Sequence, residues 1–177
     1  LKKTGNILVI TGWSYKDALI QAYTLPYLRL FKEIIPEGKT IYFVTLEQQH
    51  IRVNAEEKKR IDSELERYNI RWIPLNYQKF GIGYFMWIFY MIRLILTIFS
   101  KKITHIHAWC TTAGSAGYLL SVLTGKPLVL DSYEPHAEVM VDTGTWSKNS
   151  FKFKLLFLLE RLQGKRAVKH ILCVPEM

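Results

Sequence analysis

The sequence has only two cysteines, Cys110 and Cys173, among its 177 residues. One widely separated pair supports neither a disulfide scaffold nor a zinc knuckle, and both residues follow apolar runs. We therefore expect reduced, buried thiols and a cytoplasmic protein. Six prolines and ten glycines are too few for a collagen-like or low-complexity chain, and the apolar fraction of 49% is that of a packed globular domain.

Long hydrophobic runs are also missing. The longest candidate, Tyr84 to Phe99, has 16 residues and is interrupted by Arg93, whereas a spanning helix needs about 20 residues. The start of the chain lacks the pattern of a secretory signal. We expect residues 84–99 to form a core helix, and contact with a membrane surface is the alternative.

Acidic residues are scarce: 15 stand against 24 Lys and Arg, which gives a net charge of +9. Residues 148–170 carry seven basic side chains and a single acid, Glu160. This surplus favours an acidic partner, either membrane headgroups or phosphates. Nucleic acid is disfavoured, because the basic segment carries Phe and Leu where base-reading polar side chains would stand, and no RNA-binding motif occurs.

Glycine-rich nucleotide motifs are absent as well. The turn after the first predicted strand, TGWSY, has one glycine where a dinucleotide fingerprint needs three. No G-x-x-x-x-G-K-[ST] occurs anywhere in the sequence. The sequence therefore disfavours both NAD-dependent and P-loop chemistry.

The sequence does contain a regular alternation of short apolar runs and longer helical stretches. The runs are near-continuous, which is typical of parallel strands covered on both faces. Strands are predicted at 6–11, 40–46, 70–75, 104–109, 127–131 and 170–174, and helices at 16–35, 54–68, 82–101, 113–124 and 150–165. This order predicts one α/β domain over residues 1–177: a doubly wound, Rossmann-like parallel sheet of about six strands with helices on both faces. The apolar side of the last helix is expected to pack against the sheet.

Sheets of this kind bind ligands beyond the carboxyl ends of their strands, so the residues that follow each strand are the candidate site. Gly12 and Trp13 follow the first strand, Gln48 follows the second and Tyr77 follows the third. The small-residue segment after the fourth strand opens a helix and leaves its N-terminal amides open to an anion or a sugar oxygen. Its candidates are Thr111, Thr112 and Ser115, and the alternative is helix capping by Thr112 with close packing on the sheet.

The densest polar cluster follows the fifth strand and comprises Asp131, Tyr133, Glu134, His136, Glu138 and Asp142. Carboxylates around one imidazole can position hydroxyl groups or tune a base. We take Asp131, Glu134, His136 and Glu138 as candidate site residues. The alternative is a solvated loop with an Asx-type turn at Asp131.

No metal site is predicted. His105 and His107 alternate on one strand, but no third ligand accompanies them, so we expect buried histidines satisfied by their neighbours. Glu56 and Glu64 lie in a charge-rich helix, which we interpret as a solvated face with i,i+4 ion pairs.

Four segments, in this order, resemble the N-terminal half of a GT-B glycosyltransferase of family 4. They are NILVIT with Gly12 behind it, HIHAW before a small-residue helix, GKPLVLDSYEPHAE, and LLERLQGKRAVKHILCVPEM. Together they cover nearly the whole chain.

The resemblance implies a retaining, metal-independent hexosyltransferase that moves a sugar from a nucleotide-sugar to a saccharide or lipid-linked acceptor. This chain would be its acceptor-binding domain, with the C-terminal nucleotide-sugar-binding domain absent, so the chain alone is expected to be inactive. His136 would face the sugar being transferred, with Trp13 and residues 111–115 on the acceptor side. The donor is a co-substrate and no cofactor is implied.

A non-catalytic alternative is a membrane-docking or partner subunit of a split glycosyltransferase. Both hypotheses place the protein in the cytoplasm, with peripheral contact to the anionic inner face of the cell membrane.

Overall fold

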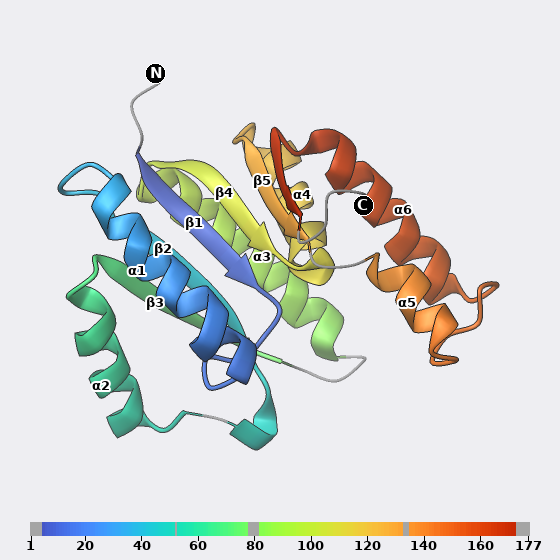
Figure 1. Cartoon of the computed structure of the whole chain (residues 1–177), viewed down its shortest axis with the longest axis horizontal. Coiled ribbons are helices and arrows are strands. Elements are labelled where there is room, and N and C mark those ends of the chain that lie inside the picture. The colour runs from blue at the N-terminus through green and yellow to red at the C-terminus, as the bar shows by residue number, and fades with distance from the viewer. Residues whose placement is uncertain (1–4, 52, 78–81, 133–134, 173–177) are drawn as a thin grey trace.

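The computed structural model describes residues 5–51, 53–77, 82–132 and 135–172. Its centre is a sheet of six parallel strands in the order β3-β2-β1-β4-β5-β6 (Figure 1). The strands are β1 (Asn6–Thr11), β2 (Ile41–Glu47), β3 (Ile70–Asn76), β4 (Ile103–Trp109), β5 (Leu128–Ser132) and β6 (Lys169–Leu172). The predicted fold class is confirmed, and strand order reverses between β1 and β4, which is the switch point of a doubly wound sheet.

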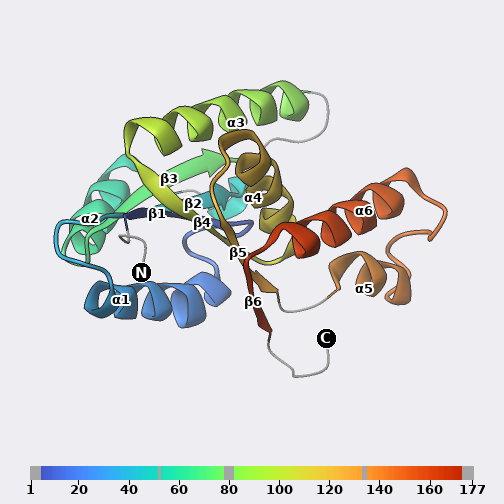
Figure 2. The same ribbon diagram turned by 90° about the horizontal axis from the view of Figure 1, so that it is seen from above.

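Helices cover both faces of the sheet (Figure 2). On one face lie α3 (Ile82–Ser100) and α4 (Thr111–Thr124), and on the other lie the π-helical turn η1 (Ile20–Thr24), α1 (Leu25–Ile34) and α2 (Ala55–Glu66). Each face has its own hydrophobic core, because alternate residues of every strand point to opposite sides. Leu8 and Ile10 of β1 belong to the core under α3 and α4, whereas Val9 belongs to the core under α1.

Local chemistry explains several helix ends. Asn54 and Glu57 form a reciprocal capping box at the start of α2. Gly125 ends α4 with a φ of 69°, a left-handed conformation that glycine adopts without steric cost. A short 3₁₀ turn, η2 (Gln49–Ile51), follows β2.

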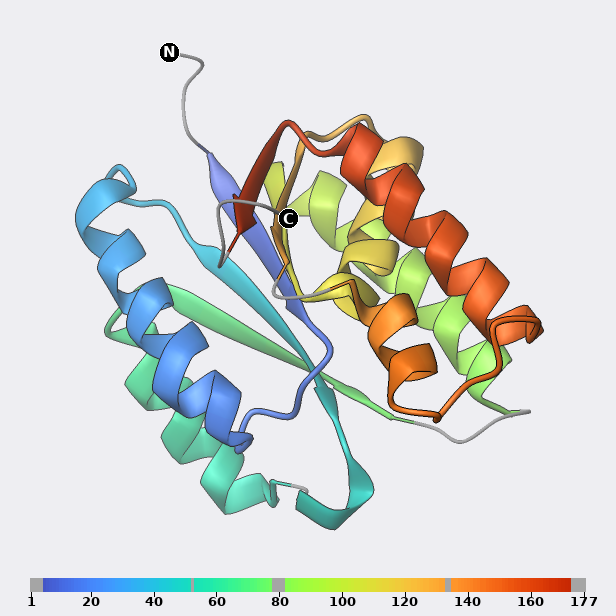
Figure 3. The same cartoon turned by 45° about the vertical axis from the view of Figure 1, so that its right-hand side comes forward.

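Three details differ from the sequence-based expectations. The predicted polar loop after β5 contains a helix, α5 (His136–Asp142). Thr112 does not cap α4, because the helix already begins at Thr111 and the preceding residue, Cys110, makes no side-chain cap. The last helix, α6 (Phe151–Arg166), packs mainly on α4 rather than on the sheet. Figure 3 shows α6 in front, with α5 beside it.

No helix among the residues that the structure describes is both long enough and apolar enough to cross a membrane.

Candidate functional site

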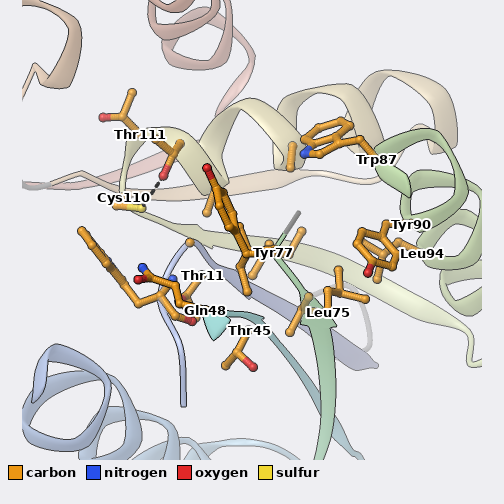
Figure 4. A pocket seen from close by; sticks show the side chains of 18 of the residues that line it. Thr11, Thr45, Gln48, Leu75, Tyr77, Trp87, Tyr90, Leu94, Cys110 and Thr111 are labelled. Carbon is orange, nitrogen blue, oxygen red and sulfur yellow. Dashed lines mark hydrogen bonds between the residues drawn. The ribbon is translucent and has the colours of Figure 1, made fainter. Parts of the chain in front are cut away.

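A cavity of about 710 Å³ lies at the carboxyl ends of the strands, where β1 and β4 diverge (Figure 4). This is the position at which doubly wound sheets bind ligands, because the loops after β1 and β4 leave toward opposite faces. The polar lining residues include Thr11, Gln48, Tyr77, Thr111, Thr112 and His136. The apolar lining comes from the strands and from α3, and includes Ile10, Leu75, Trp87, Tyr90, Met91 and Leu94.

The loop after β1 is fastened to the end of β2, which fixes one wall. The Trp13 backbone N–H donates to Thr11 Oγ1 over 2.9 Å, and the Trp13 carbonyl accepts from the Leu46 N–H over 3.1 Å. Ser14 Oγ accepts from the Gln48 N–H over 2.8 Å. The indole Nε1 of Trp13 is buried and has no hydrogen-bond partner in the structure.

The turn between β4 and α4 forms the opposite wall. Cys110 has a φ of 69°, which is uncommon for a residue with a side chain. Its N–H donates to the Asp131 carbonyl (2.8 Å) and its carbonyl accepts from the Gly114 N–H (2.8 Å), so neighbouring strand and helix both hold it. The two walls touch: a Cβ placed on Gly12 would lie 2.8 Å from Thr112 Oγ1. Glycine therefore permits the close approach of the two loops.

Helix α3 supplies the apolar side of the cavity. The Tyr90 hydroxyl accepts from the Asn76 N–H (3.2 Å) and donates to the Asn76 carbonyl (3.1 Å), which anchors the helix to the end of β3. Trp87, Tyr90 and Leu94 lie on one side of the cavity, and Cys110 and Thr111 lie on the other (Figure 4). The site is thus amphipathic, with hydroxyl groups facing an aromatic and aliphatic wall.

His136 reaches the cavity from the first turn of α5. Its ring meets the edge of the Trp146 ring at a centroid distance of 6.3 Å. Glu160 of α6 fixes the start of this helix, because its Oε1 accepts from the Ala137 N–H over 2.9 Å. Burial raises the pKa of Glu160 above its ordinary value, although the Ala137 hydrogen bond and the nearby His136 oppose this shift. The sequence-based prediction did not include Glu160, which lies 24 positions from His136 and acts as a positioning residue.

Replacing Glu160 by alanine is expected to lower the free energy of unfolding by about 1–2 kcal/mol, since a helix-end N–H loses its acceptor. Glu160→Gln keeps an accepting oxygen and should retain most of that stability. Hydrogen exchange at the Ala137 amide separates the two variants: exchange is expected to speed up in E160A and to change little in E160Q. Equal exchange in both would contradict the positioning role.

The structure brings five of the predicted site residues to this cavity: Gly12, Trp13, Thr111, Thr112 and His136. Three others do not line it. Ser115 is buried within α4 and its hydroxyl donates to the Thr111 carbonyl (3.2 Å). Glu138 is exposed on α5, and Asp131 is a buried residue of β5. Glu134 lies outside the described residues.

Asp131 and His107 occupy the sheet face opposite the cavity. Asp131 is fully buried and neither carboxylate oxygen has a hydrogen-bond partner, so the alternative of an Asx-type turn is wrong. Burial raises the pKa of Asp131 to about 6 and lowers that of His107 to about 4. His107 packs against the rings of Phe31 and Trp109, and its Nε2 also lacks a partner, which corrects the expectation of a satisfied histidine.

Among the described residues, no group of three His, Cys, Asp or Glu side chains is placed to hold a metal ion.

Several lining residues were not predicted, above all those of α3. Its apolar sequence indicated a core helix, and the spacing does not show which residues face a cavity rather than packed side chains. Gln48 and Tyr77 follow β2 and β3 and line the cavity, as the rule that ligands bind beyond strand ends led us to expect.

No protein-family model matches the chain, and no curated protein sequence matches it either. Solved structures do match it over nearly its whole length. MurG of Acinetobacter baumannii has 11% identity and a TM-score of 0.55, and the match covers 97% of this chain and 43% of that chain. A UDP-glucosyltransferase from Polygonum tinctorium capable of glucosylating indoxyl has 10% identity and a TM-score of 0.60, covering 97% and 46%.

Phytolacca americana UGT2, complexed with UDP-2fluoro-glucose and pterostilbene, has 8% identity and a TM-score of 0.56, covering 97% of this chain and 48% of that chain. The chain therefore spans less than half the length of each of these three proteins. At such identities the likeness shows the fold alone, which is a six-stranded, doubly wound Rossmann-like domain shared with GT-B proteins.

Proposed function

We propose that this chain is the acceptor-binding domain of a glycosyltransferase that moves a sugar from a nucleotide-sugar to a saccharide or lipid-linked acceptor. The observation that carries the proposal is the cavity of about 710 Å³ at the β1–β4 switch point. The fold of the chain is shared with a UDP-glucosyltransferase and with a protein whose structure was solved with both UDP-2fluoro-glucose and pterostilbene. A cavity of this size suits a sugar joined to an apolar group.

The lining residues suggest a division of roles. The Trp13 ring offers a flat surface for a sugar, while the hydroxyls of Thr111 and Thr112 offer hydrogen bonds. His136 also lines the cavity, and we assign it the role of contacting the transferred sugar or taking the proton of the acceptor hydroxyl.

The nucleotide-sugar would be bound mainly by a second, C-terminal domain that this chain does not contain. Stabilisation of the leaving phosphate then falls to that domain, and the chain alone should not transfer sugar. The proposal keeps a retaining reaction without a cofactor, and a cytoplasmic protein in peripheral contact with an anionic membrane.

The test replaces His136 by alanine in the protein that includes this chain and the segment encoded after Met177. We expect kcat/KM for sugar transfer to fall about 100-fold or more, as for the loss of a general base. Asp142→Ala, at the exposed far end of the same helix, is the matched control and should leave the rate unchanged.

Unchanged turnover in H136A would remove His136 from the reaction. Failure of the longer protein to transfer sugar from any UDP-sugar to any saccharide or lipid-linked acceptor would contradict the proposed function.

The exposed apolar surface of α3 favours a second candidate, a non-catalytic membrane-docking or partner subunit of a split glycosyltransferase. This candidate predicts a separate catalytic chain that co-purifies with this one.

A further inference from the structure

Helix α3 is apolar on two opposite sides. Tyr90, Leu94 and Ile98 are buried against the sheet, as expected for a core helix. The other side, which we call the α3 outer face, consists of Phe85, Ile88, Phe89, Ile92, Leu96 and Phe99. Five of them, Phe85, Phe89, Ile92, Leu96 and Phe99, recur at intervals of three and four residues, and Ile88 lies three residues after Phe85, so the six form one stripe along the helix. Each is between 53% and 78% exposed.

The α3 outer face is turned to the outside of the molecule. Figure 2 shows α3 as the outermost layer on its side of the sheet, with α1 on the far side. A contiguous stripe of large aromatic and aliphatic side chains is uncommon on a protein that has no partner for it, and it marks an interaction surface.

The sequence that contains this helix carries charge of one sign. Residues 67–130 contain no Asp or Glu and seven basic residues, namely Arg67, Arg71, Lys79, Arg93, Lys101, Lys102 and Lys126. Arg93 lies on α3, Lys101 and Lys102 follow its last turn, and all three are exposed. The helix that carries the apolar stripe thus has one basic residue, two more directly after its last turn, and no acidic residue.

We propose that the α3 outer face docks on an anionic lipid bilayer, with α3 lying in the plane of the interface. Apolar side chains then enter the boundary between headgroups and acyl chains, while the basic side chains reach the anionic headgroups. A second copy of this chain fits the surface less well, because contact through the same face would bring Arg93, Lys101 and Lys102 of two copies together without an acid to pair them.

Docking in this orientation places the cavity beside the bilayer. Trp87, Tyr90, Met91 and Leu94 of α3 form its apolar wall, and Trp87 is 42% exposed. An acceptor with a lipid tail can therefore reach the cavity along Trp87, with its sugar directed toward Thr111 and Thr112. This step rests on the proposed function and narrows the acceptor to a lipid-linked class, whereas the docking itself does not depend on sugar transfer.

Vesicle co-sedimentation of the 177-residue chain tests the docking, with POPC vesicles compared to POPC vesicles that contain POPG. We expect binding that requires POPG and weakens with added salt. The double variant Phe85→Asp/Phe89→Asp should lower the partition coefficient about 100-fold, since both side chains would leave the acyl boundary and repel the headgroups.

The matched control is Leu30→Asp/Ile34→Asp on α1, on the other side of the sheet. Leu30 and Ile34 are 54% and 77% exposed, so the control makes the same change of charge and hydrophobicity elsewhere. It should keep most of the POPG-dependent binding. An equal loss in both variants, or no binding of the parent chain to POPG vesicles, would overturn the docking. So would a lipid-free dimer that only F85D/F89D disrupts, because the face would then bind a second copy.

Binding of n-octyl β-D-glucopyranoside below its micelle concentration tests the acceptor class separately, with tryptophan fluorescence as the signal. We expect octyl glucoside to bind, glucose at the same concentration not to bind, and Trp87→Ala to weaken binding about tenfold. F85D/F89D should bind it normally, because neither residue lines the cavity. Equal binding of glucose and octyl glucoside would overturn the lipid-linked class and leave the docking intact. The absence of any sugar transfer by the longer protein, which includes the segment encoded after Met177, would instead contradict the proposed function.

Discussion

Replacing Gly114 by alanine is expected to lower the free energy of unfolding by about 2–3 kcal/mol. Gly114 lies where α4 meets α6, and an added Cβ would overlap Gln163 Oε1 and stand 2.7 Å from Leu130 Cδ1. Gln163 cannot easily turn away, because it is 1% exposed and its Nε2 donates to the Thr111 carbonyl (3.3 Å). The new methyl group therefore overpacks a closed interface.

Gly164→Ala is the matched control for this prediction. Gly164 also lies inside a helix, α6, but its Cβ would meet only His170 Cε1, at an ordinary distance of 3.7 Å. Alanine there should stabilise the protein by about 0.5–1 kcal/mol, the usual gain over glycine in a helix. Chemical denaturation of both variants gives the two values, and a destabilisation of similar size in both would contradict the overpacking argument.

A double variant identifies the neighbour that responds to the new methyl group. Gln163→Ala removes the atom that the methyl group would meet, so G114A/Q163A should be more stable than the sum of the two single effects predicts, by about 1–2 kcal/mol. Additive effects would instead assign the strain to Leu130. The interface matters for the site because α6 also carries Glu160, whose hydrogen bond to the Ala137 N–H holds the start of α5. A shift of α6 would thus move His136.

The strands were the most predictable part of the fold. Each of the six apolar runs matches a strand within about two residues over the described part of the chain, because a parallel strand covered on both faces needs apolar residues at nearly every position. The position of the cavity followed from the same reasoning, since Gly12 comes directly after β1 and Thr111 comes two residues after the end of β4 at the switch point.

The polar cluster after β5 shows what local patterns miss. His136 and Asp131 are only five positions apart, yet His136 lines the cavity and Asp131 points to the opposite face of the sheet. Leu130 belongs to the core under α3 and α4, and side chains alternate along a strand, so the next residue, Asp131, points the other way. Strand alternation was a usable signal for Asp131. Helix α5 is only seven residues long, so its apolar positions are too few to show a helical period.

Helix α3 and Glu160 needed the tertiary structure. An apolar helix in an α/β domain is usually covered on all sides, and only the packing shows that the α3 outer face has no protein cover. Glu160 acquires its role from the contact between α5 and α6, which no spacing in the sequence indicates.

Replacing Asp131 by asparagine is expected to raise the free energy of unfolding by about 2–3 kcal/mol at pH 8. The carboxyl group is fully buried without a hydrogen-bond partner, and burial raises its pKa from the ordinary 3.8 to about 6. Above pH 6 the folded protein must bury a charge that the unfolded chain leaves in water. Each pH unit between the two pKa values costs about 1.4 kcal/mol.

The sign of the pH dependence follows from proton binding. Between about pH 4 and pH 6 the folded state holds a proton on Asp131 that the unfolded state has lost, so stability falls as pH rises. The gain in D131N should therefore be near zero at pH 4, grow through this window and stay constant above it. Asp142→Asn, which changes an exposed carboxylate, should show no such trend. A gain in D131N that does not depend on pH would contradict the buried charge.

His107 supplies an internal check, because its effect has the opposite sign. Burial lowers its pKa from 6.5 to about 4, so between these values the unfolded state binds a proton that the folded state does not, and stability falls as pH drops. The opposing slopes of Asp131 and His107 should nearly cancel between pH 4 and pH 6 in the parent chain. His107→Phe fills the same space between Phe31 and Trp109, and it should stabilise the protein by about 2 kcal/mol at pH 5 and little at pH 8.

Thermal unfolding of the parent and of the three variants between pH 4 and pH 6 tests both groups together. The stability of the parent and of the double variant should change little with pH. The stability of D131N should rise with pH, because only His107 titrates, and that of H107F should fall, because only Asp131 titrates. Different pH slopes would contradict the view that burial alone shifts the two pKa values, and would indicate a direct interaction between Asp131 on β5 and His107 on β4.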